Sequence, residues 1–438
     1  MVKKVAIVGA GASGVLLAHY LLRRGDRYQV DLYDRLSDPR IMEFSNARTF
    51  PISLTERGMK ALGRIAGLET AVREIGLEMS GTIFHQQNGK TRVKSRQKPL
   101  VTLDRTNLVI TLLNELIKQY DNSRLNLHFD RACTTVDFAA KTITFQNIDP
   151  TATDLTVGYD LLIGADGARS VVRSYFLNTE LFEFEQKYVP TDYKSIILPR
   201  PDRALDFNLE SGKIHSWRSD DGTFVVLLHQ PDGSMSGVIL FPRHNQEVAN
   251  LVTPEQVQQF FRKRFPEVAQ MMPTSEAEAF LARSPSRILT IRCNRYHHGD
   301  SVLIIGDAAH SVSPSIGQGC NAALEDVAIL DELLDEYTDD WAEAIAQFTI
   351  RRQADAHALV ELGDYSFPSS SGLFLEFVLR EQLAKTLHQL FPVRFSPSLS
   401  ELVFESSVPY SKILHSYQGW ISKVKKRSQK SHFMGKQF

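Results

Sequence analysis

Cysteine is scarce in this sequence, with 3 residues among 438. Cys133, Cys293 and Cys320 lie too far apart for the closely spaced pairs of zinc and redox motifs, and they are too few to build a disulfide framework. Long hydrophobic runs are also missing: no window holds about 18 uninterrupted apolar residues, so we expect no membrane-spanning helix. These absences favour a reduced, soluble protein of the cytoplasm.

An excess of either charge is missing as well. The chain has 50 Lys+Arg against 51 Asp+Glu, a formal net charge of -1, whereas a general nucleic-acid binder usually carries a basic excess. Hydrophobic residues make up 43% and charged residues 23%, which is ordinary for a globular protein. At roughly 100–200 residues per domain, the length predicts two or three domains. We therefore expect a multidomain enzyme.

A glycine-rich turn lies between the first predicted elements. Residues 3–8 form a β-branched run typical of a buried strand, residues 15–24 predict a helix, and residues 28–33 predict a second strand. The turn reads GAGASG, the GxGxxG pattern of a dinucleotide site in its required context, although it does not choose between FAD and NAD(P). A glycine turn without ligand is the alternative. The predicted contact residues are Gly9, Gly11, Ala12, Ser13, Gly14, Asp34 and Arg35.

Two later strands also end in an aspartate. Asp166 follows the run LLIGA, and Asp307 follows VLIIG. Open α/β sheets bind ligands at the carboxyl ends of their strands, so both side chains are candidate ligand contacts. Asp307 is suited to accept hydrogen bonds from a polyol. Residues 317–319 (Gly-Gln-Gly) leave backbone N–H groups bare at a helix N-terminus, which can stabilise negative charge.

The remaining pattern is mixed. Helices are predicted over residues 53–65 and 106–120, and strands over 125–129 and 141–145. Residues 182–245 show strand-like segments separated by turns, which favours an antiparallel sheet. Thr253 precedes Pro254 as the N-cap of a further helix. Beyond about residue 338 the chain is predicted to be largely helical, with a loop over residues 366–372.

The order of the three motifs resembles that of the single-component FAD-dependent aromatic hydroxylases, the group A flavoprotein monooxygenases. The motifs are GxGxxG, LLIGADGARSVVR at 161–173 and VLIIGDAAHSVSPSIGQGCNAALED at 302–326. Several other segments are similar to the kynurenine 3-monooxygenases. They are residues 48–58, 103–108, 215–217, 260–266 and 408–410.

This resemblance implies a fold and a reaction. The fold would be α/β, with a Rossmann-like FAD-binding domain of the glutathione reductase type, an inserted, mostly antiparallel substrate domain and a helical C-terminal region. NADPH or NADH and O2 would serve to hydroxylate or epoxidise an aromatic or unsaturated small molecule through a flavin C4a-hydroperoxide, with no metal and no assignable catalytic side chain. The implied FAD contacts are Arg48, Arg105, Pro314, Gly317, Gly319 and Asn321, besides Asp166 and Asp307.

The domains are then expected to be discontinuous. The FAD-binding domain would comprise residues 1–70, 100–180 and 285–340. The substrate domain would comprise residues 71–99 and 181–284, and residues 341–438 would form the helical region. Its last 18 residues carry six Lys or Arg and no acid, which favours a solubilising tail or a weak peripheral contact with anionic lipid.

The substrate positions depart from the family pattern. The resemblance implies an Arg, a Tyr and an Asn where this chain has Thr82, Arg96 and Ser366. Losing the charge-assisted bond from an Arg costs roughly 1.5–3 kcal/mol, so kynurenine is expected to be a poorer substrate than another aromatic compound. Kynurenine hydroxylation remains an alternative. The further candidate substrate contacts are His215, Trp217, Ser315 and Ile316.

Two other function classes remain open. A flavin-dependent dehydrogenase or reductase could use the same scaffold, and a flavin-binding protein without catalytic activity is a third class. A halogenase of the tryptophan type is disfavoured, because its WxWxIP motif is absent and the only tryptophans are Trp217, Trp341 and Trp420.

Overall fold

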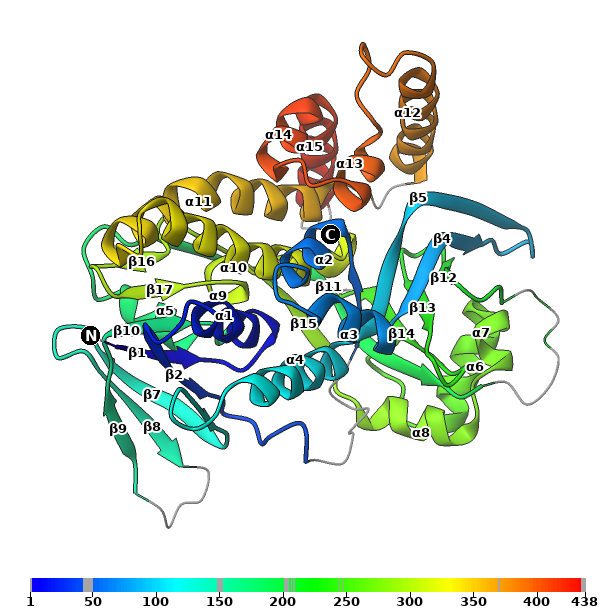
Figure 1. The fold of residues 1–438 in the computed structure, drawn as a ribbon. Coiled ribbons are helices and arrows are strands. Elements are labelled where there is room, and N and C mark those ends of the chain that lie inside the picture. The colour runs from blue at the N-terminus through cyan, green and yellow to red at the C-terminus, as the bar shows by residue number, and fades with distance from the viewer. Residues whose placement is uncertain are drawn as a thin grey trace.

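The computed structural model describes residues 2–41, 50–147, 153–200, 205, 207, 209–243, 245, 247–368 and 371–434. Arg48, one of the implied FAD contacts, lies outside these residues. Figure 1 shows two sheet regions side by side, with a long helical layer over one of them and further helices at the C-terminal end. Within the described residues, no helix is long and apolar enough to cross a membrane.

Sheet A forms the centre of the first region. Its strands, in the order β16-β17-β10-β1-β2-β6, are all parallel to their neighbours except β16. They are β1 (Lys3–Val8), β2 (Tyr28–Tyr33), β6 (Leu125–His128), β10 (Leu161–Gly164), β16 (His297–His298) and β17 (Val302–Ile304). Because β1, β10 and β17 are parallel neighbours, the three sequence motifs that follow them meet at one edge of the sheet.

Helices cover this sheet and carry its apolar core. The helix α1 is apolar on every side and almost wholly buried, as expected for a helix enclosed between a sheet and other helices. The helices of this region are α1 (Ala12–Leu22), α2 (Glu56–Leu62), α3 (Leu68–Ile75), α4 (Arg105–Gln119), α5 (Val171–Phe176), α9 (Asp307–His310) and α10 (Gly319–Glu336). A small sheet C, made of β7 (Arg131–Asp137), β8 (Thr142–Asn147) and β9 (Leu155–Gly158), flanks them.

Sheet B is the larger sheet and confirms the predicted antiparallel region. Its order is β15-β11-β14-β13-β12-β4-β5-β3, and only the β4–β12 pair is parallel. Its strands are β3 (Pro51–Leu54), β4 (Leu77–His85), β5 (Thr91–Asp104), β11 (Phe184–Leu198), β12 (Lys213–Arg218), β13 (Phe224–His229), β14 (Met235–Pro242) and β15 (Ser286–Cys293). One face packs on α6 (Pro254–Arg264), α7 (Pro266–Gln270) and α8 (Thr274–Ala282) to form a second core.

The C-terminal region is helical. Its elements are a 3-10 turn η2 (Pro314–Ile316), α11 (Trp341–Tyr365), α12 (Ser371–Leu390), α13 (Leu399–Glu405), α14 (Tyr410–Ser416) and α15 (Gln418–Met434). Side chains from η2, α10, α11 and α12–α15 share a third core. Figure 1 shows α12 standing above the bend of β5, with the loop after it projecting outward.

One local prediction was wrong and another had an inexact limit. Residues 53–65 do not form one helix, because residues 51–54 pair with β5 and the helix α2 begins only at Glu56. The predicted loop over 366–372 ends early, since Ser371 and Gly372 already belong to α12. In the first case strand pairing with a distant segment overrides the apolar spacing of the local sequence. The Thr253 cap is confirmed, since its side chain accepts a hydrogen bond from the Gln256 N–H.

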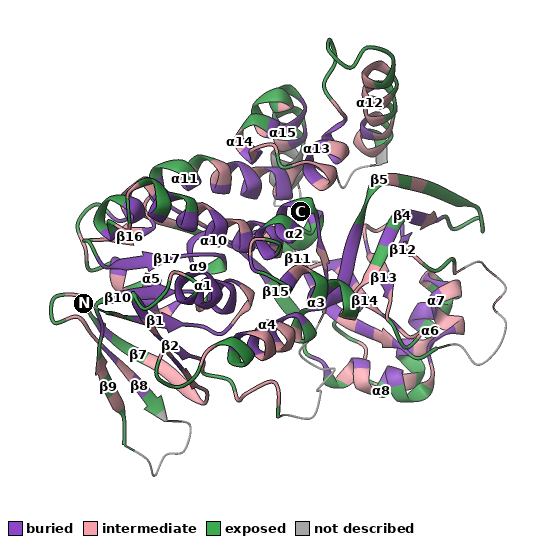
Figure 2. Cartoon of the chain, in the orientation of Figure 1, coloured by how far each residue is buried: buried purple, intermediate pink, exposed green. Residues whose placement is uncertain are grey.

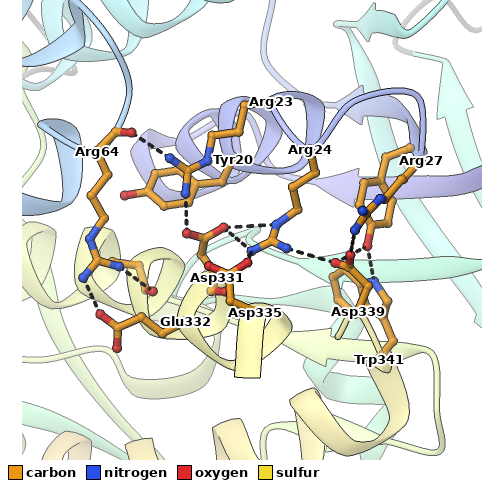
Figure 3. A network of polar contacts seen from close by, with 12 residues as sticks. Tyr20, Arg23, Arg24, Arg27, Arg64, Asp331, Glu332, Asp335, Asp339 and Trp341 are labelled. Atoms are coloured by element: carbon orange, nitrogen blue, oxygen red, sulfur yellow. Dashed lines mark hydrogen bonds and ion pairs between the residues drawn. The ribbon is translucent and has the colours of Figure 1, made fainter. Parts of the chain in front are cut away.

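An ion-pair network fastens the end of α1 to α10 (Figure 3). Arg24 donates to Asp331 at 2.6 Å and to Asp335 at 2.7 Å, and Arg23 also pairs with Asp331. The side chains of Arg24 and Asp331 are only 10% and 5% exposed, so the charge-assisted bond between them operates away from bulk water. The network holds the two helices whose N-terminal ends face the edge of sheet A.

The sheets do not divide the chain at the predicted domain limits. Residues of β3 and β15 lie in ranges assigned to the FAD-binding domain, yet both strands belong to sheet B. Their apolar side chains nevertheless pack in the first core, as Leu54 and Ile291 do. The two regions are therefore joined through strands that pair with one sheet and pack with the other.

Candidate functional site

The turn after β1 has the geometry that its glycines predict. Gly9 has φ +108, and a Cβ there would lie 2.3 Å from the Ala165 carbonyl oxygen. A Cβ on Gly14 would lie 2.0 Å from the Gly9 carbonyl oxygen, so this glycine lets α1 approach the strand. By contrast, the space where a Gly11 Cβ would point is open. The turn therefore presents bare backbone at the N-terminus of α1, as a pyrophosphate site requires.

Asp34, at the end of β2, closes this turn. One carboxylate oxygen accepts from the Ala10 N–H and the other from the Leu36 N–H, each at 2.8 Å. Each oxygen keeps a further lone pair for a ribose hydroxyl. The neighbouring Arg35 is exposed, and Ala12 and Ser13 form the first turn of α1.

Asp307, the first residue of α9, lies at the same edge of sheet A. Its side chain is accessible, yet the surrounding protein raises the pKa of its carboxyl by burial, an effect that Arg105 and His310 partly oppose. A carboxylate that solvent can reach but that protein surrounds on its other sides is suited to accept hydrogen bonds from the hydroxyl groups of a polyol ligand. Arg105 also opposes the rise that burial causes in the pKa of the Cys320 thiol. Since Arg105 acts on both Asp307 and Cys320, the predicted contacts Arg105 and Asp307 do come together.

Asp166 offers a second acceptor at this edge. Its Oδ2 accepts from the backbone N–H groups of Val171 and Val172, at 2.7 and 3.3 Å. Its Oδ1 is buried and has no partner among the described residues, and burial raises the pKa of the carboxyl. A buried carboxylate oxygen without a partner is costly, which is consistent with a ligand or water as its missing donor.

The loop before α10 has an exposed side and a buried side. Pro314, Ser315 and Gly317 are exposed, and Gly317 adopts the left-handed conformation with φ +58 and open space at its Cβ position. Asn321 is fully buried: its side chain accepts from the Thr55 N–H at 2.8 Å and donates to Ser53 and Gly317 carbonyls. Asn321 therefore fixes the loop rather than offering a free amide to a flat ligand.

Beneath the Gly306–Asp307 turn lies a polar cluster that the motifs did not reveal. The Asp326 carboxylate accepts from the Gly306 N–H at 2.8 Å, from His310 Nε2 at 2.6 Å and from Arg352 Nε at 2.5 Å. Burial alone would raise the pKa of Asp326, but His310 and Arg352 hold it below its ordinary value. The signal was the acid pair Glu325-Asp326 in the otherwise apolar stretch 322–330 of α10, but the partner Arg352 lies on α11.

Together these residues fit FAD. The open turn and the N-terminus of α1 suit a pyrophosphate, Asp34 a ribose, Asp307 a ribityl chain and the exposed side of residues 314–319 a planar ring. The part of the chain that the structure describes holds no group of three or more His, Cys, Asp or Glu side chains that could bind a metal ion.

Two of the predicted substrate residues lie in contact on sheet B. Arg96 Nη2 on β5 is 3.4 Å from Thr82 Oγ1 on β4, and its guanidinium lies 4.9 Å from the ring centre of Phe404 on α13. Burial lowers the pKa of Arg96, an effect that Glu405 opposes, and its Nε is buried without a partner among the described residues. This partly buried guanidinium keeps donor capacity for an anionic or carbonyl ligand.

The structure places the other five candidates elsewhere. His215 and Trp217 point to the opposite face of sheet B, where Trp217 donates to Glu267 of α7 at 2.5 Å. Ile316 is 1% exposed and packs in the C-terminal core. Ser366 is buried in the same region and its carbonyl oxygen accepts from Trp420. Ser315 is exposed on the loop, with its hydroxyl bonded to the Gly363 carbonyl oxygen at 2.5 Å.

His215 belongs instead to a buried histidine cluster. Its Nδ1 lies 2.9 Å from His85 Nε2, and its Nε2 lies 3.1 Å from the Glu210 carbonyl oxygen. His85 lies 2.9 Å from Glu267. Paired residues of the parallel strands β12 and β4 point to the same face of the sheet. His215 pairs with Ile83 and Trp217 with His85, so both side chains lie on the face opposite to Thr82.

Comparison with known proteins agrees with this geometry. The family described as FAD binding domain matches residues 3–362. The kynurenine 3-monooxygenase of Drosophila willistoni is 32% identical over 94% of this chain and 89% of its own length. The enzyme of the same name from Legionella pneumophila strain Corby is 30% identical over 94% and 90%, and that of Sus scrofa 29% over 96% and 87%.

Two solved structures show the same fold at low sequence identity. The tetrameric form of 2-methyl-3-hydroxypyridine-5-carboxylic acid oxygenase has a TM-score of 0.69 and 18% identity, covering 83% of this chain and 91% of that one. P. aeruginosa PqsL in complex with 2-aminobenzoylacetate has a TM-score of 0.63 and 20% identity, covering 83% and 95%.

Proposed function

The chain belongs to the family of FAD-dependent aromatic hydroxylases that includes the kynurenine 3-monooxygenases, and we propose that it hydroxylates kynurenine on the aromatic ring. FAD, with NADPH as electron donor, supplies the oxygen-activating redox chemistry. In the overall reaction NADPH reduces one oxygen atom of O2 to water, and the other atom replaces a ring hydrogen as a hydroxyl group. The observation that carries the proposal is the 32% identity over 94% of the chain to a protein of that activity.

Arg96 offers a positive charge in place of the Arg that the family resemblance implies at position 82, where this chain has a threonine. An Arg at position 82 would project from β4, and here the guanidinium comes from the neighbouring strand β5 and reaches within 3.4 Å of the Thr82 hydroxyl. The positive charge is thus moved by one strand rather than lost. We propose that Arg96 binds the amino-acid carboxylate and that the Thr82 hydroxyl donates a further hydrogen bond to it.

The surroundings of Arg96 support this role. The guanidinium lies over the ring of Phe404, which restricts its position, and Glu405 lies near enough to act on its pKa. A desolvated guanidinium binds a carboxylate with charge-assisted bonds worth about 1.5–3 kcal/mol each. The oriented, partly dehydrated cation is therefore suited to an anionic substrate group.

The test compares two ligands on the FAD-loaded enzyme. Kynurenine should stimulate NADPH and O2 consumption and give a product heavier by one oxygen atom, which isotopically labelled O2 should supply. An aryl ketone that lacks the amino-acid group should stimulate far less. Oxidation of kynurenine without incorporated oxygen would instead indicate a dehydrogenase, and stimulation only by other aromatic acids would exclude kynurenine as the substrate.

The role of Arg96 is tested separately. Arg96→Met keeps the length and apolar contact with Phe404 but removes the charge, so KM for kynurenine should rise about 10–100-fold, corresponding to about 1.5–3 kcal/mol. The KM for the ketone without a carboxylate should change little. A matched variant is Arg92→Met on the exposed part of β5, for which both values should stay near those of the unaltered enzyme. An unchanged kynurenine KM in Arg96→Met would contradict the assignment.

A further inference from the structure

A separate cavity lies on the far side of sheet A from the cofactor edge. It has a volume of about 720 Å³ and is lined by residues at the end of β7, at the end of α5, in the loop after α5 and in the segment before β17. Figure 2 shows β7 as largely exposed or intermediate, so the cavity opens at the surface of the molecule. A cavity of this size can hold a small ligand.

Two elements connect this cavity to the cofactor edge and show that the two sites are distinct. The helix α5 begins beside Asp166, which accepts hydrogen bonds from its first backbone N–H groups, and Tyr175 near its other end lines the cavity. His298 in the cavity pairs with Val302, the first residue of β17, whereas Asp307 follows the end of that strand. The cavity therefore lies at the amino ends of the parallel strands, and the cofactor edge lies at their carboxyl ends.

Two aromatic rings lie together in the wall of this cavity. The ring centres of Phe138 and His298 are 4.8 Å apart, and their planes are inclined by 30°. Phe138 is also held edge to face by Phe176 at 5.5 Å. Burial lowers the pKa of His298, and the positive charge of Arg295 lowers it further, so this imidazole is neutral at pH 7. The two rings therefore offer a planar, uncharged surface on which an aromatic ligand can stack.

Charged residues of both signs line the same cavity without pairing. Arg295 donates through Nη2 to the Thr179 hydroxyl at 2.8 Å and to the Glu180 carbonyl oxygen at 3.2 Å. No acidic side chain of the described residues forms an ion pair with this guanidinium. Asp137 and Glu180 also line the cavity, and within the part of the chain that the structure describes their carboxylates have no ion pair. The cavity therefore offers one cation and two anions to a ligand.

The loop that forms one wall of the cavity is held in place by two adjacent residues. Asn294 donates to the Leu181 carbonyl oxygen at 2.7 Å and accepts from the Glu183 N–H at 3.0 Å. Leu181 has φ +58, a left-handed conformation that is strained for a leucine. Arg295 fixes the residues just before it. Since these contacts maintain a strained loop, the cavity wall is already formed in the protein without a ligand.

We propose that this cavity binds a zwitterionic aromatic amino acid at a site separate from the one where the reaction takes place. The carboxylate of the ligand accepts hydrogen bonds from Arg295, its ammonium group lies against Asp137 and Glu180, and its ring stacks on Phe138 and His298. A phosphorylated ligand would meet the two carboxylates as like charges, and a neutral aromatic compound would leave all three charges unused. The proposal does not depend on which compound the enzyme hydroxylates.

The test is calorimetric titration of the full-length, FAD-loaded enzyme with three indole compounds. L-Tryptophan carries both charges, tryptamine lacks the carboxylate, and indole-3-propionate lacks the ammonium group. L-Tryptophan should bind about tenfold more tightly than either analogue, because each analogue loses charge-assisted contacts. Absence of saturable L-tryptophan binding, or equal affinity for the three compounds, would overturn the proposal.

Three variants locate the binding site. Arg295→Met removes the guanidinium and should raise the Kd for L-tryptophan about tenfold. Glu180→Gln keeps the shape of an exposed side chain and should raise that Kd about threefold, while the Kd for indole-3-propionate stays unchanged. The control is Glu183→Gln, at an exposed residue of the same segment that does not line the cavity, and it should leave both values unchanged. An unchanged Kd for L-tryptophan in Arg295→Met would contradict the proposal.

The same titration separates this cavity from the substrate site. Arg96→Met should keep the L-tryptophan binding that Arg295→Met loses. The opposite pattern would assign L-tryptophan to the substrate site and overturn the proposal. FAD content should be normal in Arg295→Met and Glu180→Gln, which shows that both variants fold whether or not kynurenine is the substrate. If Arg295→Met lost FAD, the isosteric Glu180→Gln would decide, and an unchanged Kd for L-tryptophan in that variant would refute the site.

Discussion

Asp326→Asn is the most informative change to the cofactor site that does not touch the cofactor. The substitution keeps the size and one carbonyl-type acceptor, but it removes the negative charge that Gly306, His310 and Arg352 share. Asp326 and Arg352 are both fully buried. We expect the folded protein to lose stability and the Gly306–Asp307 turn to lose its fixed position.

The structure sets the size of both effects. Removing one partner of a buried ion pair costs about 3–5 kcal/mol, and here the lower end applies because Arg352 keeps Glu325 at 2.8 Å. The turn is held to Asp326 by one backbone hydrogen bond, which contributes about 1 kcal/mol. If that contribution is lost from cofactor binding, the Kd for FAD should rise about fivefold.

The assay combines urea unfolding of the apoprotein with FAD titration followed by flavin fluorescence. Asp331→Asn is the matched control, because it lies on the same helix and also removes the charge of a buried carboxylate, which pairs with Arg23 and Arg24. This control should lose stability but keep its affinity for FAD. If Asp326→Asn also keeps the original Kd for FAD, the carboxylate does not position the turn and the reasoning is refuted.

Two further predictions concern the glycine turn and the histidine cluster. Gly11→Ala should fold but bind FAD poorly, because its Cβ enters the open space over the turn, whereas Gly14→Ala should fail to fold because its Cβ meets the Gly9 carbonyl oxygen at 2.0 Å. Circular dichroism reports whether each variant folds, and FAD titration measures its affinity. Normal FAD affinity in Gly11→Ala would contradict the phosphate assignment. Burial lowers the pKa of His215 to about 4, so on acidification this imidazole binds a proton in the unfolded chain before it does so in the folded protein. The free energy of unfolding should therefore fall by up to roughly 3 kcal/mol as the pH drops from about 6.5 to about 4. Urea unfolding across this range should show a smaller fall for His215→Gln and an unchanged fall for the exposed His415→Gln.

Local sequence was sufficient for the cofactor edge. The tight turn, the close approach of α1 and the open phosphate position each depend on a glycine at a fixed place, so the GxGxxG spacing encodes them directly. Asp166 and Asp307 follow short apolar strands, and parallel neighbours bring their carboxyl ends to one edge. The fold class, the family and the FAD cofactor could therefore be predicted without coordinates.

Sheet pairing decided the substrate side. Thr82 and Arg96 are 14 residues apart in a hairpin with a register shift between Met79 and Gly81, and only the resulting pairing shows that the guanidinium reaches the threonine. The same is true of His215 and Trp217, whose side of the sheet follows from the parallel pairing of β12 with β4. A single residue of register moves every side chain to the other face, so no local pattern could assign them.

Taken alone, the sequence determined the elements that bind the cofactor, because their chemistry depends on residues next to one another in the chain. The tertiary structure decided everything that joins distant segments. It placed Asp326 and Arg352 from two helices under one turn, brought the Arg96 guanidinium of β5 to the Thr82 hydroxyl, and left the leucines of α12 uncovered. Whether such side chains are buried, paired or exposed depends on which elements pack together, and that is a property of the whole fold.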